Sequence, residues 1–126
     1  MSQSYLLATD IGTQGTRTAL FDTAGNILAS VAQEYALETP APGWAQQDAR
    51  MWWDCTARNI RTLLQQAGIN PARILCVGVD SQMHATIPID KHGEVLVPAV
   101  QVWCDKRNAG LVDAFSRHPS LPHMRV

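Results

Sequence analysis

An apolar segment that directly follows a helical one constrains the fold of this chain more than any other feature. Residues 73–80, RILCVGVD, form a continuous apolar run of the kind found in strands buried on both faces. Before it, residues 49–67 favour a helix that begins after Asp48, an N-cap residue, and ends at Gly68 and Pro71. A strand in this position predicts a parallel crossover connection, and therefore an α/β fold.

The predicted helix carries an apolar pattern on one side. Apolar residues recur in it at spacings of three and four, which predicts one face packed on a core. We therefore interpret its first stripe residue, a tryptophan, as a core residue and not as a binding platform. Trp44, in the loop before the helix, is likewise interpreted as a packing residue. The predicted stripe consists of Trp53, Ala57, Ile60, Leu64 and Ala67.

Three strand-like runs precede the helix and predict an antiparallel meander. They cover residues 5–11, 16–22 and 26–37 and are separated by short turns. The second turn, in FDTAGNIL, resembles a later one, in IDKHGEVL. Each predicts a hairpin loop with Asp at its start and Gly at positive φ. The similarity favours a reuse of turn chemistry over an internal repeat.

The order of these segments predicts the fold class. After the apolar strand, ATIPID and VLVPAVQVW predict a further hairpin, and residues 107–115 predict a helix. We therefore expect an α/β domain with a mixed sheet, as in the ribonuclease-H-like or actin-like ATPase architecture. A length of 126 residues with 46% hydrophobic residues is enough for one domain with a core.

Composition argues against several classes of protein. Ten basic and eleven acidic residues are scattered along the chain, so neither nucleic acid nor an anionic membrane is an expected partner. No signal or membrane-spanning run is present, which predicts a cytoplasmic protein. Cys55, Cys76 and Cys104 lack metal-site spacing and are expected to be reduced, mostly buried thiols. The C-terminal segment with Pro119 and Pro122 has no closing apolar element, so we expect a longer parent chain.

The turn inside TDIGTQGTRTALFD is the main candidate for chemistry. Its glycines let the backbone approach a ligand, its threonines add hydroxyl donors, and its arginine adds a positive charge. Its aspartate would repel a bare phosphate, which favours a hydrated Mg²⁺ between the two. The turn alone leaves phosphate binding and a plain hairpin equally open, but a P-loop or Rossmann site is disfavoured because a strand follows. These residues are Asp10, Gly12, Thr13, Gly15, Thr16 and Arg17.

Four ordered motifs between residues 5 and 107 resemble the N-terminal part of the FGGY carbohydrate kinases. They are DIGTQGTRTALFD, PGWAQQD before a Trp-bearing helix, VDSQMHAT and PAVQVWCDKR. The resemblance implies an actin-like fold of two ribonuclease-H-like domains that transfers the γ-phosphoryl of ATP to a sugar or polyol hydroxyl. It implies that residues 1–126 are the N-terminal part of the first domain, with the general base and adenosine pocket in later segments. The chain alone is therefore expected to be inactive.

The resemblance also implies roles for the first motif. Asp10 is implied to organise the water shell of Mg²⁺, and the turn to border the β- and γ-phosphates of ATP. Asp80, at the end of the apolar strand, is disfavoured as the catalytic base because the family base lies in a later segment. The implied phosphate-binding residues are Gly12, Thr13, Gln14, Gly15 and Arg17.

The third and fourth motifs are implied to bind the sugar. Gln-Met-His in VDSQMHAT is similar to xylulose kinases, whereas glycerol kinases have an Arg-Glu pair, so the resemblance implies a ketopentose such as xylulose. The histidine imidazole offers one hydrogen-bond donor and one acceptor to the sugar, and the aspartate carboxylate accepts hydrogen bonds. The methionine thioether offers an apolar wall, and the tryptophan indole can cover the apolar face of the sugar. The implied substrate residues are Gln82, Met83, His84, Trp103 and Asp105.

Several alternatives stay open. Ser81, Ala85, Cys104 and Lys106 depart from the commoner xylulose-kinase residues, so ribulose, rhamnulose, gluconate or glycerol remain alternative substrates. A non-catalytic sugar-binding module of the same fold is a further alternative, and a homodimer of the full-length protein is left open. A haloacid-dehalogenase-like phosphohydrolase ranks low, because that motif needs an aspartate where Gly12 stands.

Overall fold

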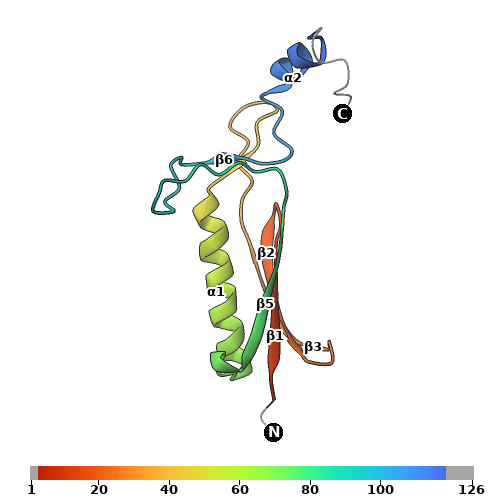
Figure 1. Ribbon diagram of the computed structural model, residues 1–126, viewed down its shortest axis with the longest axis vertical. Coiled ribbons are helices and arrows are strands. Elements are labelled where there is room, and N and C mark those ends of the chain that lie inside the picture. The colour runs from red at the N-terminus through yellow and green to blue at the C-terminus, as the bar shows by residue number, and fades with distance from the viewer. Residues whose placement is uncertain (1–2, 119–126) are drawn as a thin grey trace.

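The architecture is one long helix packed on a mixed four-stranded sheet (Figure 1). The computed structural model describes residues 3–118; Pro119 and Pro122 lie outside this range. The strand order is β3-β2-β1-β5, with β1 antiparallel to β2 and parallel to β5. This confirms the predicted meander, the parallel crossover and the mixed sheet. The sheet strands are β1 (Tyr5–Ile11), β2 (Gly15–Asp22), β3 (Ile27–Glu34) and β5 (Ile74–Ser81).

Helix α1 (Ala49–Ala67) has the predicted limits because both of its ends are capped. The Asp48 carboxylate accepts a hydrogen bond from the backbone N–H of Arg50 at 2.9 Å. At the other end Gly68 has a φ of 65°, the left-handed conformation that glycine adopts without strain. A short 3-10 turn, Pro71–Arg73, then leads into β5.

The predicted apolar stripe of α1 is wrong by one residue. Trp53 is 71% exposed, whereas its neighbour Trp52 is only 8% exposed and lies in the core. The buried face contains polar side chains, Thr56 and Asn59, and the Asn59 amide donates to the backbone oxygen of Thr16 at 3.1 Å. Because polar residues lie in the true stripe, counting apolar residues selects the adjacent face.

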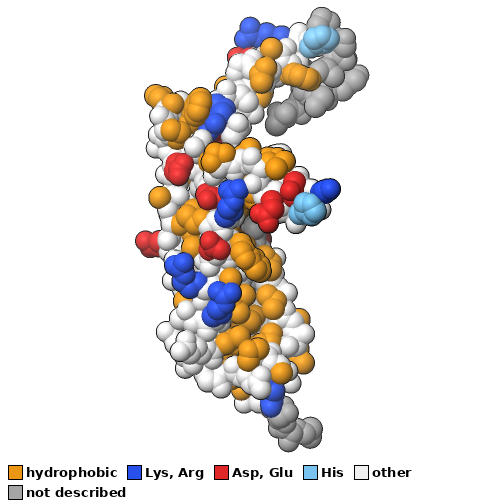
Figure 2. Space-filling model, turned by 90° about the vertical axis from the view of Figure 1, so that its left-hand side faces the viewer, with side chains coloured by type: hydrophobic (Ala, Val, Ile, Leu, Met, Phe, Trp, Pro, Cys, Tyr) orange, Lys and Arg blue, Asp and Glu red, His pale blue; other side chains and the backbone are white. Residues whose placement is uncertain are grey.

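Strand β5 is not buried on both faces as its sequence predicts. In the described part of the chain it is the edge strand, and α1 packs mainly on β2 and β3 instead. Leu75, Val77 and Val79 are 64%, 50% and 65% exposed. Figure 2 shows hydrophobic side chains gathered at the surface on the α1 side of the molecule.

The chain between β5 and its last helix is mostly irregular. The predicted hairpin is reduced to a single bridge between Ile89 and Val95, while β6 (Val100–Gln101) pairs with β4 (Gln46–Gln47). A helix, α2 (Ala109–Ser116), follows as predicted. The two similar turns are confirmed, since their glycines at positions 25 and 93 have φ values of 89° and 85°.

Buried apolar residues form two separate clusters. The helix–sheet core consists of Leu7, Leu20 and Leu63, packed between α1 and the sheet. The loop core joins the start of α1 to β6 and consists of Ala45, Ala49, Trp52, Val100 and Val102. The loop core therefore supports the region above the strand ends.

The remaining sequence expectations concern cysteines and membranes. Cys55 is buried, Cys104 half-buried and Cys76 exposed, so the prediction of mostly buried thiols is wrong for Cys76, which lies on the edge strand. Within residues 3–118, no helix has the length and apolar character needed to cross a bilayer.

Candidate functional site

Three charged side chains lie side by side where strands β5, β1 and β2 approach one edge of the sheet. Asp10 on β1 is in register with Arg17 on β2 and with Asp80 on β5. All three are exposed, on the sheet face opposite the buried Thr9 and Thr18. Since β1 and β5 are parallel, their carboxyl ends bring Asp10 and the segment after Asp80 to the same edge, as the sequence predicts.

The β1–β2 turn, residues 12–14, is held in a fixed shape. The backbone N–H of Gly12 donates to the oxygen of Gly15 at 2.9 Å. Tyr35 braces the turn twice, because its hydroxyl donates to the oxygen of Gly12 at 2.6 Å and its N–H to that of Gln14 at 3.1 Å. Burial, with smaller effects of Cys55 and Asp10, raises the pKa of Tyr35 to about 12. Its hydroxyl therefore stays protonated and remains a donor to the turn.

Two backbone N–H groups of this turn are free to bind a ligand. Those of Thr13 and Gln14 donate to no acceptor within residues 3–118. Adjacent free N–H groups of this kind form a suitable site for phosphate oxygens.

Two residues of the predicted turn, Gly15 and Thr16, lie at the start of β2 and have structural roles that differ from the expectation. A Cβ atom on Gly15 would lie 2.6 Å from the backbone oxygen of Gln33, so glycine is required there for the approach of β3. Thr16 is 2% exposed and its hydroxyl donates to the oxygen of Asp10 at 3.0 Å. The expectation that Thr16 offers a hydroxyl to a ligand is therefore wrong, because its side chain faces α1.

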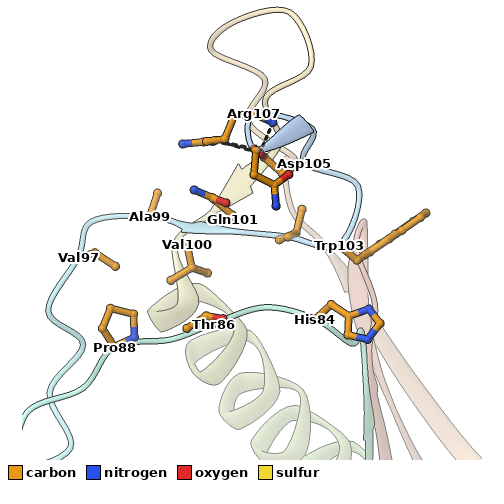
Figure 3. Close-up of a pocket in the computed structure, with 12 residues that line it drawn as sticks. His84, Thr86, Pro88, Val97, Ala99, Val100, Gln101, Trp103, Asp105 and Arg107 are labelled. Carbon is orange, nitrogen blue, oxygen red and sulfur yellow. Dashed lines mark hydrogen bonds and ion pairs between the residues drawn. The ribbon is translucent and has the colours of Figure 1, made fainter. Parts of the chain in front are cut away.

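Three of the five predicted sugar residues, His84, Trp103 and Asp105, line a hollow next to the strand ends, whereas Gln82 does not. A pocket of about 530 Å³ has His84 and Trp103 at one end and Pro88 and Val97 at the other (Figure 3). His84 has a φ of 60° and is the one non-glycine residue with positive φ in the described part of the chain. Strain of this kind costs about 1–3 kcal/mol and is concentrated at functional sites. Met83, outside this lining, is 67% exposed.

Asp105 holds the loop around the pocket together. Its carboxylate is 2% exposed and forms an ion pair with Arg107 at 2.7 Å. It also accepts hydrogen bonds from the N–H groups of Ala45 at 2.6 Å and Arg107 at 2.9 Å. Hydrogen bonding from the Arg107 side chain is the main reason that the pKa of Asp105 is lowered to about 2. This geometry favours a structural role for Asp105 over the predicted sugar contact.

Arg107 also connects the loop around Asp105 to the segment before α1. Its guanidinium lies 3.9 Å from the ring centroid of Trp44 and donates to the side-chain oxygen of Gln46 at 3.0 Å. Trp44 is 41% exposed and packs against this cation, which agrees with its interpretation as a packing residue.

The structure brings the predicted phosphate turn into contact with two of the predicted sugar residues, Trp103 and Gln82. The indole N–H of Trp103 donates to the hydroxyl of Thr13 at 2.9 Å, and that hydroxyl donates to the side-chain oxygen of Gln82 at 3.1 Å. The Thr13 hydroxyl is thus committed to neighbouring side chains, and its backbone N–H is the group left for a phosphate.

Sequence analysis missed two residues that hold the site. Gln47 is fully buried, and its amide donates to the backbone oxygen of Thr13 at 2.7 Å. Tyr35 braces the same turn, as described above. A polar residue immediately before the helix cap was the available signal for Gln47, whereas no local pattern marks Tyr35.

The residues present suit a hydrated magnesium ion and not a fully coordinated metal. Within residues 3–118, no three His, Cys, Asp or Glu side chains converge on a common point. Asp10 is exposed at the strand end, beside the free N–H groups of the turn. One carboxylate, water and phosphate oxygens together form the usual environment of Mg²⁺ in nucleotide sites.

Comparisons with known proteins show which family and which relatives this chain is similar to. The sequence pattern of the FGGY family of carbohydrate kinases, N-terminal domain, matches residues 5–126. A glycerol kinase of Thermococcus gammatolerans is 34% identical over 115 residues, which cover 91% of this chain and 23% of that protein.

Two solved structures resemble the fold closely. The gluconate kinase of Lactobacillus acidophilus has a TM-score of 0.82 and 31% identity, covering 92% of this chain and 23% of its own. The xylulose kinase of the same organism has a TM-score of 0.80 and 30% identity, with 90% and 23% covered. The chain thus spans about a quarter of the length of the proteins that it matches.

Proposed function

Because the chain belongs to the FGGY family of carbohydrate kinases, as an N-terminal domain, we propose that it forms the phosphate and sugar side of an ATP-dependent sugar kinase. The proposed reaction breaks the bond between the γ-phosphorus of ATP and its bridging oxygen and forms a new bond to a sugar hydroxyl oxygen. ADP leaves, and the hydroxyl proton passes to a base in a later segment. The proposed compartment is the cytoplasm, where ATP is available.

The turn after β1 positions the phosphates in this proposal. The free N–H groups of Thr13 and Gln14 and the guanidinium of Arg17 bind phosphate oxygens, while Gly12 and Gly15 keep the turn tight. Asp10 holds Mg²⁺ through water, and this ion would neutralise phosphate charge. Phosphoryl transfer depends mainly on such positioning.

The pocket above the strand ends holds the sugar. Met83, His84 and Trp103 are exposed, and Gln82 is hydrogen-bonded to the turn. Asp105 shapes the loop around the pocket through Arg107. We propose a ketopentose such as xylulose, because His84 offers an imidazole in the pocket lining and Met83, next to it in the chain, offers an exposed apolar side chain.

One observation carries the proposal. The Thr13 hydroxyl receives a hydrogen bond from Trp103 and gives one to Gln82, which supports the proposal that the phosphates and the sugar bind side by side. A γ-phosphoryl group on the turn would therefore lie next to a sugar in the pocket. This proximity is what group transfer requires.

ADP release tests the proposal directly. We would express the complete reading frame that contains this chain and measure ADP formation from MgATP with xylulose, ribulose, rhamnulose, gluconate, glycerol or no sugar. Stimulation by one ketopentose is expected. Stimulation by glycerol or gluconate instead would overturn the substrate assignment, and ATP binding without any stimulation would favour a non-catalytic sugar-binding module.

A histidine pair provides a matched test of the sugar site. His84→Ala should lower kcat/KM for the accepted sugar by about tenfold or more, since it removes a hydrogen-bonding partner worth about 1–3 kcal/mol. His92→Ala, on the exposed hairpin turn, should leave kcat/KM unchanged. Equal kcat/KM values for the two variants would exclude His84 from the sugar site.

A further inference from the structure

We propose that Gln47 is a positioning residue that couples the phosphate turn to the sugar side, so that each ligand strengthens the binding of the other. This inference rests on the proposed function, because it assumes that both ligands bind at the site described above. It concerns a residue that need contact neither ligand. Its basis is one chain of hydrogen bonds around the buried side chain of Gln47.

The Gln47 amide is fully buried and fully satisfied. Its side chain is 0% exposed. The amide nitrogen donates to the backbone oxygens of Thr13 at 2.7 Å and Ala36 at 3.1 Å. The amide oxygen accepts from the indole of Trp52 at 3.1 Å and from the side-chain nitrogen of Gln82 at 3.0 Å. Two donors and two acceptor sites are all that a primary amide has.

The orientation of this amide is fixed by its neighbours. The indole N–H of Trp52 is a donor only, so the Gln47 oxygen must face it. A flipped amide would place its nitrogen against that indole and its oxygen against two carbonyl oxygens. Trp52 is itself 8% exposed and anchored in the loop core. Gln47 is therefore a rigid support and not a mobile surface group.

Gln47 closes a ring that contains both sides of the proposed site. Gln82 donates to Gln47 and accepts from the hydroxyl of Thr13, while the backbone oxygen of Thr13 accepts from Gln47. Trp103 joins the ring through the same hydroxyl. Hydrogen bonds thus restrain both the side chain and the backbone of Thr13, and they fix the direction of its free N–H group.

This ring gives a physical route for coupling. A sugar that contacts Gln82 or Trp103 restrains side chains hydrogen-bonded to Thr13, whose N–H is proposed to bind phosphate. Part of the conformational entropy that nucleotide binding would remove has then already been lost on sugar binding. Thermodynamic linkage requires the same factor in both directions, and couplings of about 5–150-fold are typical.

Nucleotide affinity with and without sugar tests the coupling. In the protein from the complete reading frame, the Kd of a nonhydrolysable ATP analogue with Mg²⁺ would be measured by calorimetry, without sugar and with the accepted sugar at saturation. The unmodified protein should bind the analogue about fivefold or more tightly with sugar. Gln47→Glu keeps the acceptor for Trp52 and Gln82 but sets a carboxylate against two carbonyl oxygens. The ratio of the Kd without sugar to the Kd with sugar should therefore fall to about one. Gln66→Glu, exposed on α1, is the matched control and should keep the ratio.

A second pair of variants tests the same ring if Gln47→Glu does not fold. Thr13→Val keeps the shape of the residue but removes the hydroxyl between Trp103 and Gln82. It should bring the ratio of the two Kd values to about one, whereas Thr13→Ser should preserve the ratio of the unmodified protein. A drop in affinity that is equal with and without sugar would overturn the coupling and assign the hydroxyl to phosphate binding. The coupling is also overturned if Gln47→Glu and Gln66→Glu give the same ratio. If no sugar stimulates ADP formation by the unmodified protein, the proposed function fails instead, which is a different result.

Discussion

The helix–sheet core and the loop core are built in different ways. In the first, Leu20 and Leu63 are 1% and 0% exposed between regular elements, and backbone ladders join the strands beneath them. In the second, two-residue strands are tied by side chains, namely Gln47 and the Asp105–Arg107 pair. The first core supplies a scaffold, and the second positions the candidate site. We expect substitutions in the helix–sheet core to lower the free energy of unfolding, and substitutions in the loop core to change the geometry of the candidate site.

Removing a large side chain from the helix–sheet core should have the largest effect. Leu63→Ala deletes fully buried apolar atoms and leaves a cavity, so the free energy of unfolding should fall by about 2–5 kcal/mol. Urea unfolding followed by far-UV circular dichroism measures it. Leu64→Ala, next to it but only half-buried, is the control and should lose less. Equal losses would mean that α1 packs on its other face.

The scaffold was largely predictable because its signals are local. The limits of α1 follow from Asp48 and Gly68, and the two similar turns follow from their Asp and Gly residues. The buried stripe of α1 was not predictable in the same way. Asn59 is 2% exposed because it bonds the backbone of β2, a partner 43 residues away that no periodicity reveals.

Adding a side-chain atom where β2 and β3 approach most closely, at Gly15, should have the next largest effect. A methyl group on Gly15 would meet the backbone oxygen of Gln33 at 2.6 Å, so Gly15→Ala should destabilise the fold by about 1–3 kcal/mol and displace the phosphate turn. Urea unfolding again measures the loss. Gly110→Ala, in α2, meets nothing within 4 Å and should be neutral or slightly stabilising. A neutral Gly15→Ala would show that the two strands can separate without cost.

The candidate site was predictable only where it lies on regular strands. Asp10 and Arg17 follow from the turn and the strand register. The partners of Asp105 do not, because Ala45 lies 60 residues away and meets it only through the loop core. For the same reason the hydrogen bond between Trp103 and Thr13, 90 residues apart, could not be predicted. Polar contacts between distant loops leave no pattern in a single sequence.

Acid should loosen the loop core through Asp105. Its folded pKa of about 2 lies below the ordinary value of 3.8, so its stabilising effect is complete above pH 3.8 and is lost as the pH falls through about 2. Asp105→Asn should therefore make the decline in thermal midpoint over this range shallower. Asp113→Asn, whose carboxylate is 73% exposed, should follow the unmodified protein. If Asp105→Asn follows it too, the ion pair with Arg107 does not form in solution.

Removing one hydroxyl at the boundary between the two regions should have the smallest effect on stability and still change the turn. Tyr35→Phe deletes the donor to the oxygen of Gly12, a loss of about 0.5–1.5 kcal/mol in the free energy of unfolding. The backbone bond from residue 35 to Gln14 remains, so the turn keeps one of its two braces. Tyr5→Phe, on β1 and with no hydroxyl partner among residues 3–118, is the control for losing a phenol oxygen. Backbone amide exchange at Gly12, whose N–H donates to the oxygen of Gly15 across the turn, should accelerate in Tyr35→Phe and not in Tyr5→Phe, because only the first loosens the turn. Unchanged exchange in both variants would mean that the Gln47 amide and the backbone hydrogen bonds of the turn hold it without the Tyr35 hydroxyl.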